Sequence, residues 1–262
     1  TVVMNQPCDV YVISLATPGG RTRLTRLRDH LDALGFDRVH VQPGIHGKYL
    51  TPDEVATHAT TACQHMCTPS MIGCAASHAA VWRRVIASGA PYAIVLEDDT
   101  EMVPDAKDHV RWIASHMPSD TDMVVLGRFL CGTSPTPVPT SQQSFRRIYQ
   151  FSGTHAYIVT RRGARALLDH AYPVAFHLDM VISHLSRRDT VHVYAVTHDV
   201  ASQTSGEATS ENVTDRPPGF PGIAYTALKH VRDPKGQSLF FYAAMPVGRV
   251  GSYTHHAVIT SM

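Results

Sequence analysis

The stretch "YAIVLEDDT", residues 92–100, runs a short apolar segment directly into three consecutive carboxylates. The apolar part predicts a buried strand of a parallel sheet. Three ionised acids at Glu97, Asp98 and Asp99 repel one another, so such a cluster is normally stabilised by solvent, by basic partners or by a bound cation. In a doubly wound sheet, ligands bind at the carboxyl ends of the strands, and the predicted strand brings the acids to that edge.

Strands and helices alternate on both sides of this stretch. Short apolar segments predict strands, and apolar residues at helical spacing with capping residues before them predict helices. The order predicts an α/β fold with a Rossmann-like, mostly parallel sheet and helices on both of its faces. We expect strands over residues 9–15, 37–43, 92–97 and 122–127, and helices over residues 21–36, 51–61, 72–88 and 104–117.

The second half of the chain is less regular. Residues 131–144 are rich in Pro, Ser and Thr and are expected to form a mobile surface loop. We expect residues 1–205 to form one domain with an irregular acceptor region toward the C-terminus, and residues 206–262 to form an extension of unassigned role packed on the same domain. The remaining segments predict antiparallel strands over 146–152 and 154–160, helices over 161–171 and 177–188, and a last strand over 191–196.

The composition is that of an ordinary globular chain. Hydrophobic residues make up 44% and charged residues 17% of the 262 residues, and the formal net charge is +1. This balance gives no electrostatic footprint for nucleic acid or for an anionic membrane. No apolar run approaches the roughly 20 residues of a membrane span, and the first residues lack the features of a signal peptide. We therefore expect a soluble, cytoplasmic protein.

The five cysteines are an odd number spread over a long chain, which does not indicate a disulfide framework. We expect buried free thiols in a reducing compartment. One alternative is zinc, because Cys63, Cys67, Cys74 and His78 form a C-x3-C-x6-C-x3-H pattern. The inner gap is short for a common zinc module, and Cys74 and His78 lie within a predicted helix.

The acids after residue 96 favour a hard cation. Carboxylate oxygens at a strand end suit Mg²⁺ or Mn²⁺, which keep part of their coordination shell for phosphate oxygens. Alternate residues of an extended segment point to the same side, so Glu97 and Asp99 can face one ion while Asp98 faces away. The alternative is an acidic cluster that caps the next helix.

Four blocks of the chain, in order, resemble glycosyltransferase family 25, which includes lipooligosaccharide and collagen galactosyltransferases. The central block has the family's Gly-Cys-x-x-Ser-His-x-x-x-Trp helix and the strand that ends in Glu-Asp-Asp. The opening "VISLATPGGRTRL" and the later "GTHAYIVTRRGARALL" and "HLDMVI" are similar to further blocks of the family. In this sequence the central motif residues are Gly73, Cys74, Ser77, His78, Trp82, Glu97, Asp98 and Asp99.

The resemblance, which covers roughly residues 9–205, implies a GT-A fold and transfer of a sugar with inversion, often galactose from UDP-galactose. The partners it implies are a UDP-sugar donor and a saccharide or hydroxylated protein acceptor, and the cofactor is Mn²⁺ or Mg²⁺. A cation held by Glu97 and Asp99 would stabilise the diphosphate leaving group. The donor-binding residues implied by the matching blocks are Leu15, Arg21, Gly73, His78 and Asp98.

Two further roles are assigned less directly. GT-A enzymes commonly add a later metal ligand, for which His198 is the candidate and Asp199 the alternative. An inverting transfer needs a base on the acceptor side, and Asp179 at the start of an apolar helix matches an acid of the family pattern. Asp179 is alternatively a helix-start acid that favours the dipole. His78 is also expected to orient an acid or the donor loop, and Trp82 is expected in the core.

Other classes of function compete with transfer. Hydrolysis of phosphate esters also uses clustered acids, but the chain shows no Asp/His array of the kind that a two-metal site requires. A catalytically silent module that binds a nucleotide sugar would keep every block described above. Consumption of a UDP-sugar in the presence of an acceptor distinguishes these three classes.

Overall fold

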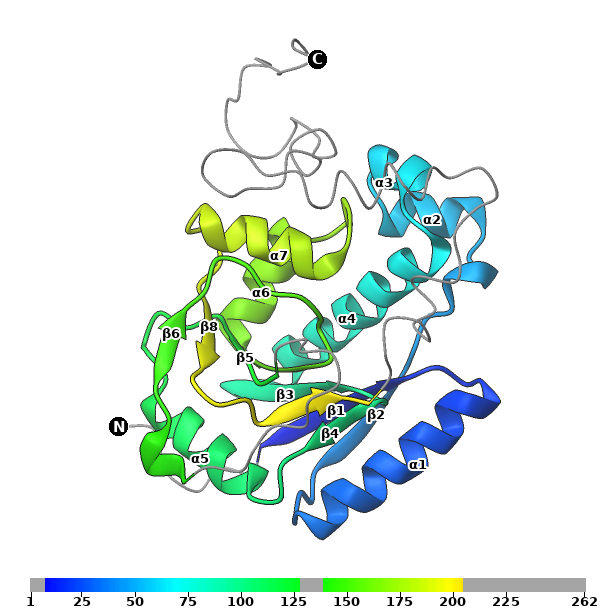
Figure 1. Cartoon of the computed structure of the whole chain (residues 1–262). Coiled ribbons are helices and arrows are strands. Elements are labelled where there is room, and N and C mark those ends of the chain that lie inside the picture. The colour runs from blue at the N-terminus through cyan, green and yellow to red at the C-terminus, as the bar shows by residue number, and fades with distance from the viewer. Residues whose placement is uncertain (1–7, 128–138, 205–262) are drawn as a thin grey trace, which may run out of the picture.

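The computed structural model describes residues 8–127 and 139–204, which build an α/β fold around one seven-stranded sheet (Figure 1). The strand order is β2-β1-β3-β7-β5-β8-β6. Parallel pairs join β1 to β2, β1 to β3 and β5 to β8, whereas β7 and β6 run against their neighbours. The Rossmann-like, mostly parallel class expected from the sequence is therefore confirmed. The main sheet comprises β1 (Asp9–Ser14), β2 (Val39–Pro43), β3 (Tyr92–Glu97), β5 (Met123–Val125), β6 (Phe145–Arg147), β7 (Ala156–Thr160) and β8 (Val193–Val196).

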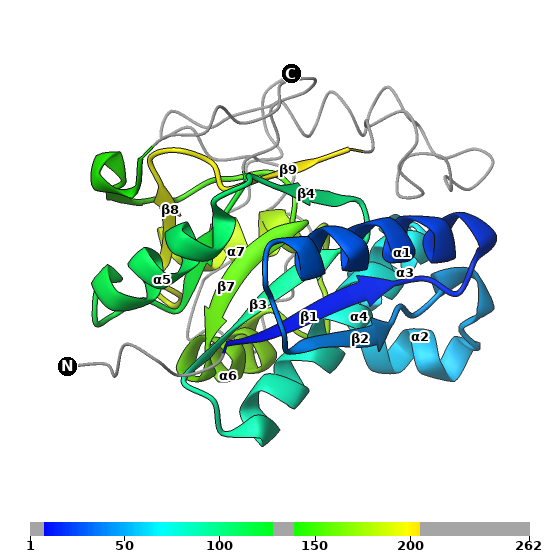
Figure 2. The same ribbon diagram turned by 90° about the horizontal axis from the view of Figure 1, so that it is seen from below.

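Helices cover both faces of this sheet (Figure 2). Helices α1 and α5 lie on one face, and α4, α6 and α7 lie on the other. The helices are α1 (Pro18–Ala33), α2 (Pro52–His58), α3 (Thr61–Met66), α4 (Pro69–Ser88), α5 (Ala106–His116), α6 (Arg161–His170) and α7 (Leu178–Arg187), with short 3-10 helices η1 (Gly47–Tyr49) and η2 (Thr140–Gln142).

Strand β3 shows why the residues before the three carboxylates are apolar. Ala93 and Val95 point into the core beneath α4, α6 and α7. Ile94 and Leu96 point into the separate core beneath α1 and α5. Because successive side chains of a strand face opposite sides, a central strand covered on both faces needs an unbroken apolar run. The first carboxylate, Glu97, stands where this double cover ends.

Helix α4 carries the Gly-Cys-x-x-Ser-His motif and has strong boundary signals. The side chain of Thr68 accepts a hydrogen bond from the backbone N–H of Met71, and Pro69 occupies the first turn. Gly89 ends the helix with φ of 73°, a conformation that glycine adopts without steric cost. The helix therefore begins and ends close to the range that its sequence predicts.

The later strands differ from the expectation in their partners. Antiparallel strands were expected over 146–152 and 154–160. Strand β7 lies within the second range, but β6 already ends at Arg147, and β6 pairs with β8 while β7 lies between β3 and β5. A small second sheet pairs β4 (Thr100–Met102) with β9 (Ala201–Gln203) and was not expected. Its strands are too short to leave a periodic signal in the sequence.

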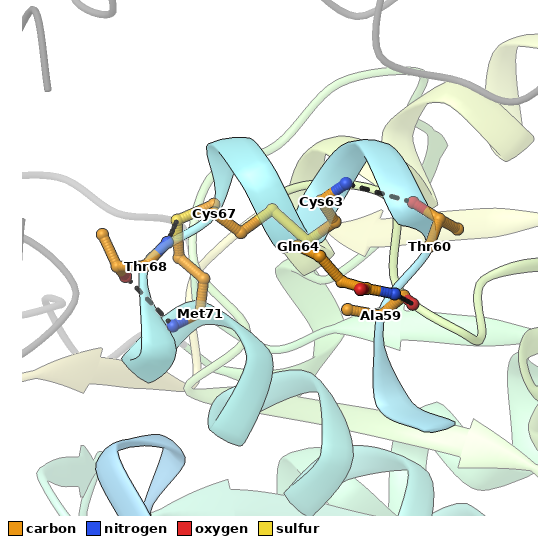
Figure 3. Close-up of a disulfide and its surroundings, with 7 residues drawn as sticks. All are labelled: Ala59, Thr60, Cys63, Gln64, Cys67, Thr68 and Met71. Carbon is orange, nitrogen blue, oxygen red and sulfur yellow. Dashed lines mark hydrogen bonds between the residues drawn. A yellow bond between two sulfur atoms is a disulfide. The ribbon is translucent and has the colours of Figure 1, made fainter. Parts of the chain in front are cut away.

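The expectation of free thiols at Cys63 and Cys67 is wrong, because the two form a disulfide (Figure 3). Cys63 lies in α3 and Cys67 directly follows this helix, so their spacing of four brings the two side chains together, with Cα atoms 4.9 Å apart. Cys8 and Cys74 are free, as expected. Cys131 lies outside the described residues.

Some expectations fall wholly or partly outside the described ranges. The extension over 206–262 lies outside them, as do residues 131–138 of the expected loop, whereas η2 occupies part of the remainder. Within residues 8–127 and 139–204, no helix combines the length and the apolar character needed to cross a bilayer.

Candidate active site

The site lies at the carboxyl ends of β1 and β3, where β7 begins. Glu97 pairs in register with Ile13 of β1, and its backbone N–H donates to the carbonyl of His155 at 2.8 Å. Its carboxylate is held by one oxygen: Oε1 accepts from Thr154 Oγ1 at 2.9 Å and lies 3.3 Å from His78 Nε2. Among the described residues, no hydrogen bond reaches Oε2, and 28% of the side chain is exposed. Glu97 therefore presents one oxygen atom outward.

The surroundings keep Glu97 ionised. Burial is the largest single influence and raises the pKa of this carboxyl. The hydrogen bond and the electrostatic interaction with His78, with smaller contributions from His155 and Thr154, outweigh burial and bring the pKa below its usual 4.5. A charged carboxylate with one open oxygen is suited to a cation.

Asp98 points away from this oxygen, as alternation along the segment predicts. Its Oδ2 accepts from Ser14 Oγ at 2.7 Å, and its Oδ1 accepts from Arg23 Nε at 2.7 Å. The side chain is buried and links the end of β1 to α1. Its two oxygens are thus engaged within the protein, so Asp98 supports the loop that begins α1.

Asp99 is buried beneath the chain after β9. Its Oδ2 accepts from Gln203 Nε2 at 2.9 Å, and its backbone carbonyl accepts from both the N–H and the hydroxyl of Thr204. The pairing of β4 with β9 places Thr100 opposite Gln203. This pairing therefore brings a later segment of the chain directly onto the acidic cluster.

The structure does not gather Glu97, Asp99 and His198 into one set of converging ligand atoms. The backbone of His198 bonds to the side chain of Gln143, which also reaches His109 of α5. The antiparallel register sets Gln203, five positions further on, against Asp99. The later residue that contacts the acids is therefore a glutamine, and a metal role for His198 stays a prediction.

Asp179 stands at the first turn of α7 and faces the same region. Its Oδ2 accepts from the backbone N–H of Gly153 at 2.9 Å, and its Oδ1 accepts from the N–H of Met180. Gly153 has φ of 85°, so the loop before β7 needs glycine at this position. The acid anchors this loop, and a further role as base stays a prediction.

Cys74, His78 and Glu97 offer ligand atoms that lie within 4.8 Å of one another. Two of these atoms already face each other, since His78 Nε2 lies beside Glu97 Oε1. Burial raises the pKa of the Cys74 thiol well above 9, and the charges of Glu97 and Asp179 raise it further. The trio is better described as a hydrogen-bonded support for Glu97 than as a thiolate metal site. The expected zinc alternative also loses Cys63 and Cys67 to their disulfide.

The remaining donor-site candidates lie around the same edge. Leu15 follows β1, and its carbonyl lies so close to Gly20 that a Cβ there would stand 2.1 Å from the carbonyl oxygen. Arg21 is exposed and donates to the carbonyl of Ala16, whereas Arg23, two positions later, donates to the Asp98 carboxylate. Gly73 packs against backbone, since a Cβ there would lie 2.4 Å from the carbonyl of Ile45. Gly73 thus has a packing role, and the donor roles remain predictions.

Three contacts of the site could not be assigned from the sequence. Thr154 holds Glu97, Gln203 holds Asp99, and Tyr157 contacts His78 at 2.9 Å. Thr154 and Tyr157 lie in the "GTHAYIVT" block, whose likeness to a family block was the available signal. His155 in the same block is buried, neither of its ring nitrogens bonds to any described residue, and burial lowers its pKa.

A Rossmann-like sheet with carboxylates at its carboxyl edge is the arrangement found in GT-A glycosyltransferases. The family described as glycosyltransferase family 25 (LPS biosynthesis protein) matches residues 8–182, well over half of the chain. The chain therefore belongs to glycosyltransferase family 25 and is a transferase with this type of fold. No curated protein sequence matches it closely enough to count as a relative.

Solved structures show distant likenesses. One is a mutant of Drosophila beta-1,4-galactosyltransferase 7 in complex with manganese, UDP-Gal and xylobiose, with 11% identity, coverage of 86% of this chain and 81% of that chain, and a TM-score of 0.41. A glycosyltransferase involved in glycosylation of the major capsid of PBCV-1 has 11% identity, coverage of 79% and 98%, and a TM-score of 0.40. Mouse xyloside xylosyltransferase 1 in its apo form has 10% identity, coverage of 72% and 85%, and a TM-score of 0.38.

Proposed function

We propose that this site transfers a hexose, galactose from UDP-galactose, with inversion to a hydroxyl of a saccharide or hydroxylated protein acceptor. The observation that carries the proposal is the state of Glu97. One of its oxygens is fixed by two contacts, and the other has no hydrogen bond from a described residue and lies at the ligand-binding edge of the sheet. Membership in family 25 supplies the class of reaction.

The residues present fit a hard divalent cation. Glu97 and Asp99 offer carboxylate oxygens, which Mg²⁺ and Mn²⁺ prefer, and the pKa of Glu97 is low enough to leave it charged at neutral pH. When bound there, Mn²⁺ or Mg²⁺ would stabilise the negative charge of the diphosphate leaving group. The network that fixes Glu97 supplies the rigidity such a site needs.

The residues of the chain divide the remaining work. The backbone around Leu15 and Gly20, with Arg21 nearby, borders the edge where the donor's uridine and phosphates bind. On the acceptor side, the hydroxyl oxygen attacks the anomeric carbon as the bond from that carbon to the diphosphate breaks. The Asp179 carboxylate takes the hydroxyl proton, and UDP leaves. The N–H of Gly153 holds Asp179 in place for that step.

A turnover assay tests the proposal and separates it from its alternatives. The purified chain is incubated with UDP-sugars, Mn²⁺ and a panel of saccharide and hydroxylysine acceptors, and UDP release is measured with and without chelator. We expect release that depends on acceptor and metal and is fastest with UDP-galactose. Phosphate release from simple esters would indicate a hydrolase instead. UDP binding without turnover would indicate a silent module.

A further inference from the structure

A chain of buried polar groups stands behind Glu97. Trp82 Nε1 donates to the Tyr157 hydroxyl at 3.0 Å, the same hydroxyl lies 2.9 Å from His78 Nδ1, and His78 Nε2 lies 3.3 Å from Glu97 Oε1. Trp82, Tyr157 and His78 are each no more than 1% exposed. Two elements contribute them, α4 and β7, which pack against each other across the sheet face.

One placement of the protons satisfies every group in this series of hydrogen bonds. The indole N–H of Trp82 is only a donor, so the oxygen of Tyr157 must accept from it. If Nδ1 of His78 also donated to that oxygen, the tyrosine proton would have no acceptor among the described residues. In a neutral ring, the lone pair of Nε2 would then face the Glu97 carboxylate. If Tyr157 instead donates to Nδ1, the proton of His78 sits on Nε2 and points at Glu97, and every group is satisfied.

Two further observations agree with this arrangement. Burial raises the pKa of Tyr157 well above 10, so its hydroxyl keeps the proton that it donates. Thr154 donates to the same oxygen of Glu97 that His78 faces, at 2.9 Å. Both donors therefore act on Oε1, and their joint effect is to turn Oε2 outward.

We propose that Trp82 and Tyr157 are positioning residues that hold His78 as the tautomer protonated on Nε2, so that His78 and Thr154 fix Oε1 of Glu97 and present Oε2 to a ligand. This rests on the proposed function in assigning the ligand as the cation of a nucleotide-sugar complex. It goes beyond that function because it assigns the orientation of the Glu97 carboxylate to Trp82 and Tyr157, two residues that do not touch the site.

Two alternative roles for these residues predict different behaviour of the His78 ring. If Trp82 and Tyr157 only filled the core, the state of His78 would not depend on the Tyr157 hydroxyl. If Cys74, His78 and Glu97 ligated a metal through His78 Nε2, that nitrogen would carry no proton and Nδ1 would donate to Tyr157. The protonated ring nitrogen of His78 therefore excludes or supports the metal-ligand alternative, and its response to loss of the Tyr157 hydroxyl separates the proposal from core filling.

Nitrogen-15 NMR of the histidine rings in the full chain without ligand reads this nitrogen directly, with His78→Gln used to assign the signals. We expect Nε2 to be protonated and Nδ1 to be unprotonated. Protonation of Nδ1, alone or together with Nε2, would overturn the proposal. The protonation state is read in the wild-type protein, and His78→Gln serves only to assign the signals, so this test does not depend on the folding of a Tyr157 variant or on whether the chain turns over a UDP-sugar.

A pair of matched variants then tests the link to Glu97. Tyr157→Phe and Tyr11→Phe each remove one buried hydroxyl from the same core, but Tyr11 lies on β1 and stacks on His40. We expect Tyr157→Phe alone to change the His78 signals and to weaken Mn²⁺-UDP binding about tenfold. Equal affinity in the two variants would overturn the positioning role.

Discussion

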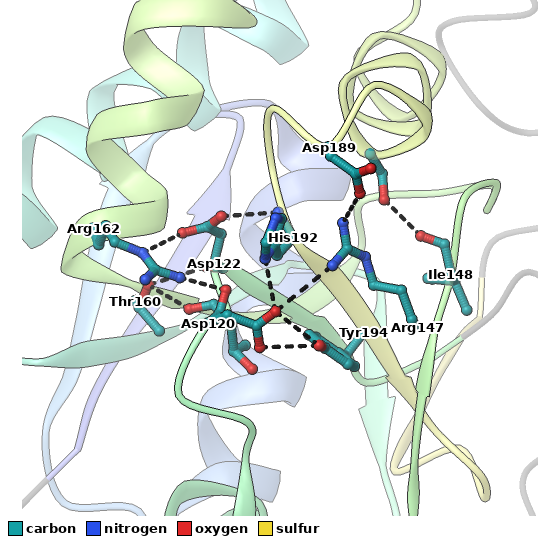
Figure 4. A network of polar contacts seen from close by, with 11 residues as sticks. Asp120, Asp122, Arg147, Ile148, Thr160, Arg162, Asp189, His192 and Tyr194 are labelled. Carbon is teal, nitrogen blue, oxygen red and sulfur yellow. Dashed lines mark hydrogen bonds and ion pairs between the residues drawn. The ribbon is translucent and has the colours of Figure 1, made fainter.

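Two clusters of acids and histidines lie at opposite edges of the main sheet. At the carboxyl edge stand Glu97 and Asp99 with His78. At the amino edge, just before β5 and β8, stand Asp120 and Asp122 with His192 (Figure 4). Each cluster combines two acids with one histidine. The clusters differ in what their carboxylate oxygens contact.

The amino-edge acids are saturated by donors. Asp122 is buried, and its oxygens accept from Arg162 Nε and from the backbone N–H of His192, both at 2.8 Å (Figure 4). Asp120 accepts from His192 Nδ1 at 2.8 Å and from the Tyr194 hydroxyl at 3.0 Å. Burial raises the pKa of Asp120, but the hydrogen bonds from Tyr194 and His192 outweigh burial and bring it below 3.8. This cluster ties β5, β8 and α6 together.

A carboxylate oxygen left open by the protein, and not the residue type, distinguishes the carboxyl-edge site from the amino-edge cluster. Glu97 has two contacts on one oxygen and none from described residues on the other. The amino-edge acids use both oxygens of each carboxylate for structure. Changes at the carboxyl edge should therefore affect binding and turnover, and changes at the amino edge should affect stability.

The largest expected effect is on turnover, in Asp179→Asn. The amide oxygen of asparagine can still accept from Gly153, so the loop should stay in place, but the carboxylate proposed to take the acceptor proton is lost. We expect turnover to fall by roughly 10²- to 10⁴-fold with Mn²⁺-UDP affinity retained. Asp169→Asn, at an exposed position on α6, is the matched control. Near-normal turnover in Asp179→Asn would limit Asp179 to its structural contact.

The next largest effect is expected on stability, from Asp122→Asn at the amino edge. The change removes a buried charge that accepts from Arg162 and from a backbone N–H, and hydrogen bonds to charged groups contribute roughly 1.5–3 kcal/mol each. Because Arg162 is largely exposed, we expect a loss of about 2–3 kcal/mol in the free energy of unfolding, measured with urea. Mn²⁺-UDP affinity should stay within twofold. A parallel loss of affinity would mean that the two edges are coupled.

A smaller effect is expected on how stability depends on pH, and it comes from His184 in the second half of α7. This helix begins near Gly153 at the carboxyl edge. Burial, with the charges of Arg188 and Arg187, lowers the pKa of His184 from 6.5 to about 4. The unfolded chain then binds the proton more readily, so stability is fully present above pH 6.5 and is lost as pH falls toward 4. The expected loss from this group is about 2 kcal/mol between pH 7 and pH 5.

The control for this effect is His184→Gln, which cannot take up the proton. Urea unfolding of both proteins at pH 7 and pH 5 isolates the contribution of His184, because all other histidines are shared. We expect a smaller loss of stability on acidification in the variant. The same pH dependence in both proteins would show that His184 is not held neutral by its surroundings.

The sequence predicted those parts of the fold that depend on local periodicity. The apolar run of β3 and the capped, apolar-patterned α4 lie close to their expected ranges, since burial on both faces and helix caps leave signals within a few residues. The partner of β6 was not predictable in this way. Strand pairing is a contact between distant segments, and a three-residue strand carries little information about its neighbour.

The site was predictable to the same extent. The acids and His78 could be singled out because one strand and one helix carry them. Gln203 reaches Asp99 across 104 positions, and Trp82 meets Tyr157 across 75, so neither contact has a local signature. The Cys63–Cys67 bond was missed for another reason. An odd cysteine count in a long chain favours free thiols, although the last turn of α3 and the residue after it bring these two cysteines together.

The central claim is that the carboxyl edge alone binds a metal–nucleotide complex. Titration calorimetry of Mn²⁺-UDP with the wild-type chain, Asp99→Asn and Asp122→Asn tests it most directly, because both variants remove one buried carboxylate charge from opposite edges of one sheet. We predict that Asp99→Asn weakens binding by at least tenfold, about 1.4 kcal/mol, while Asp122→Asn binds like the wild type. Unchanged affinity in Asp99→Asn, or an equal loss in both variants, would contradict the claim.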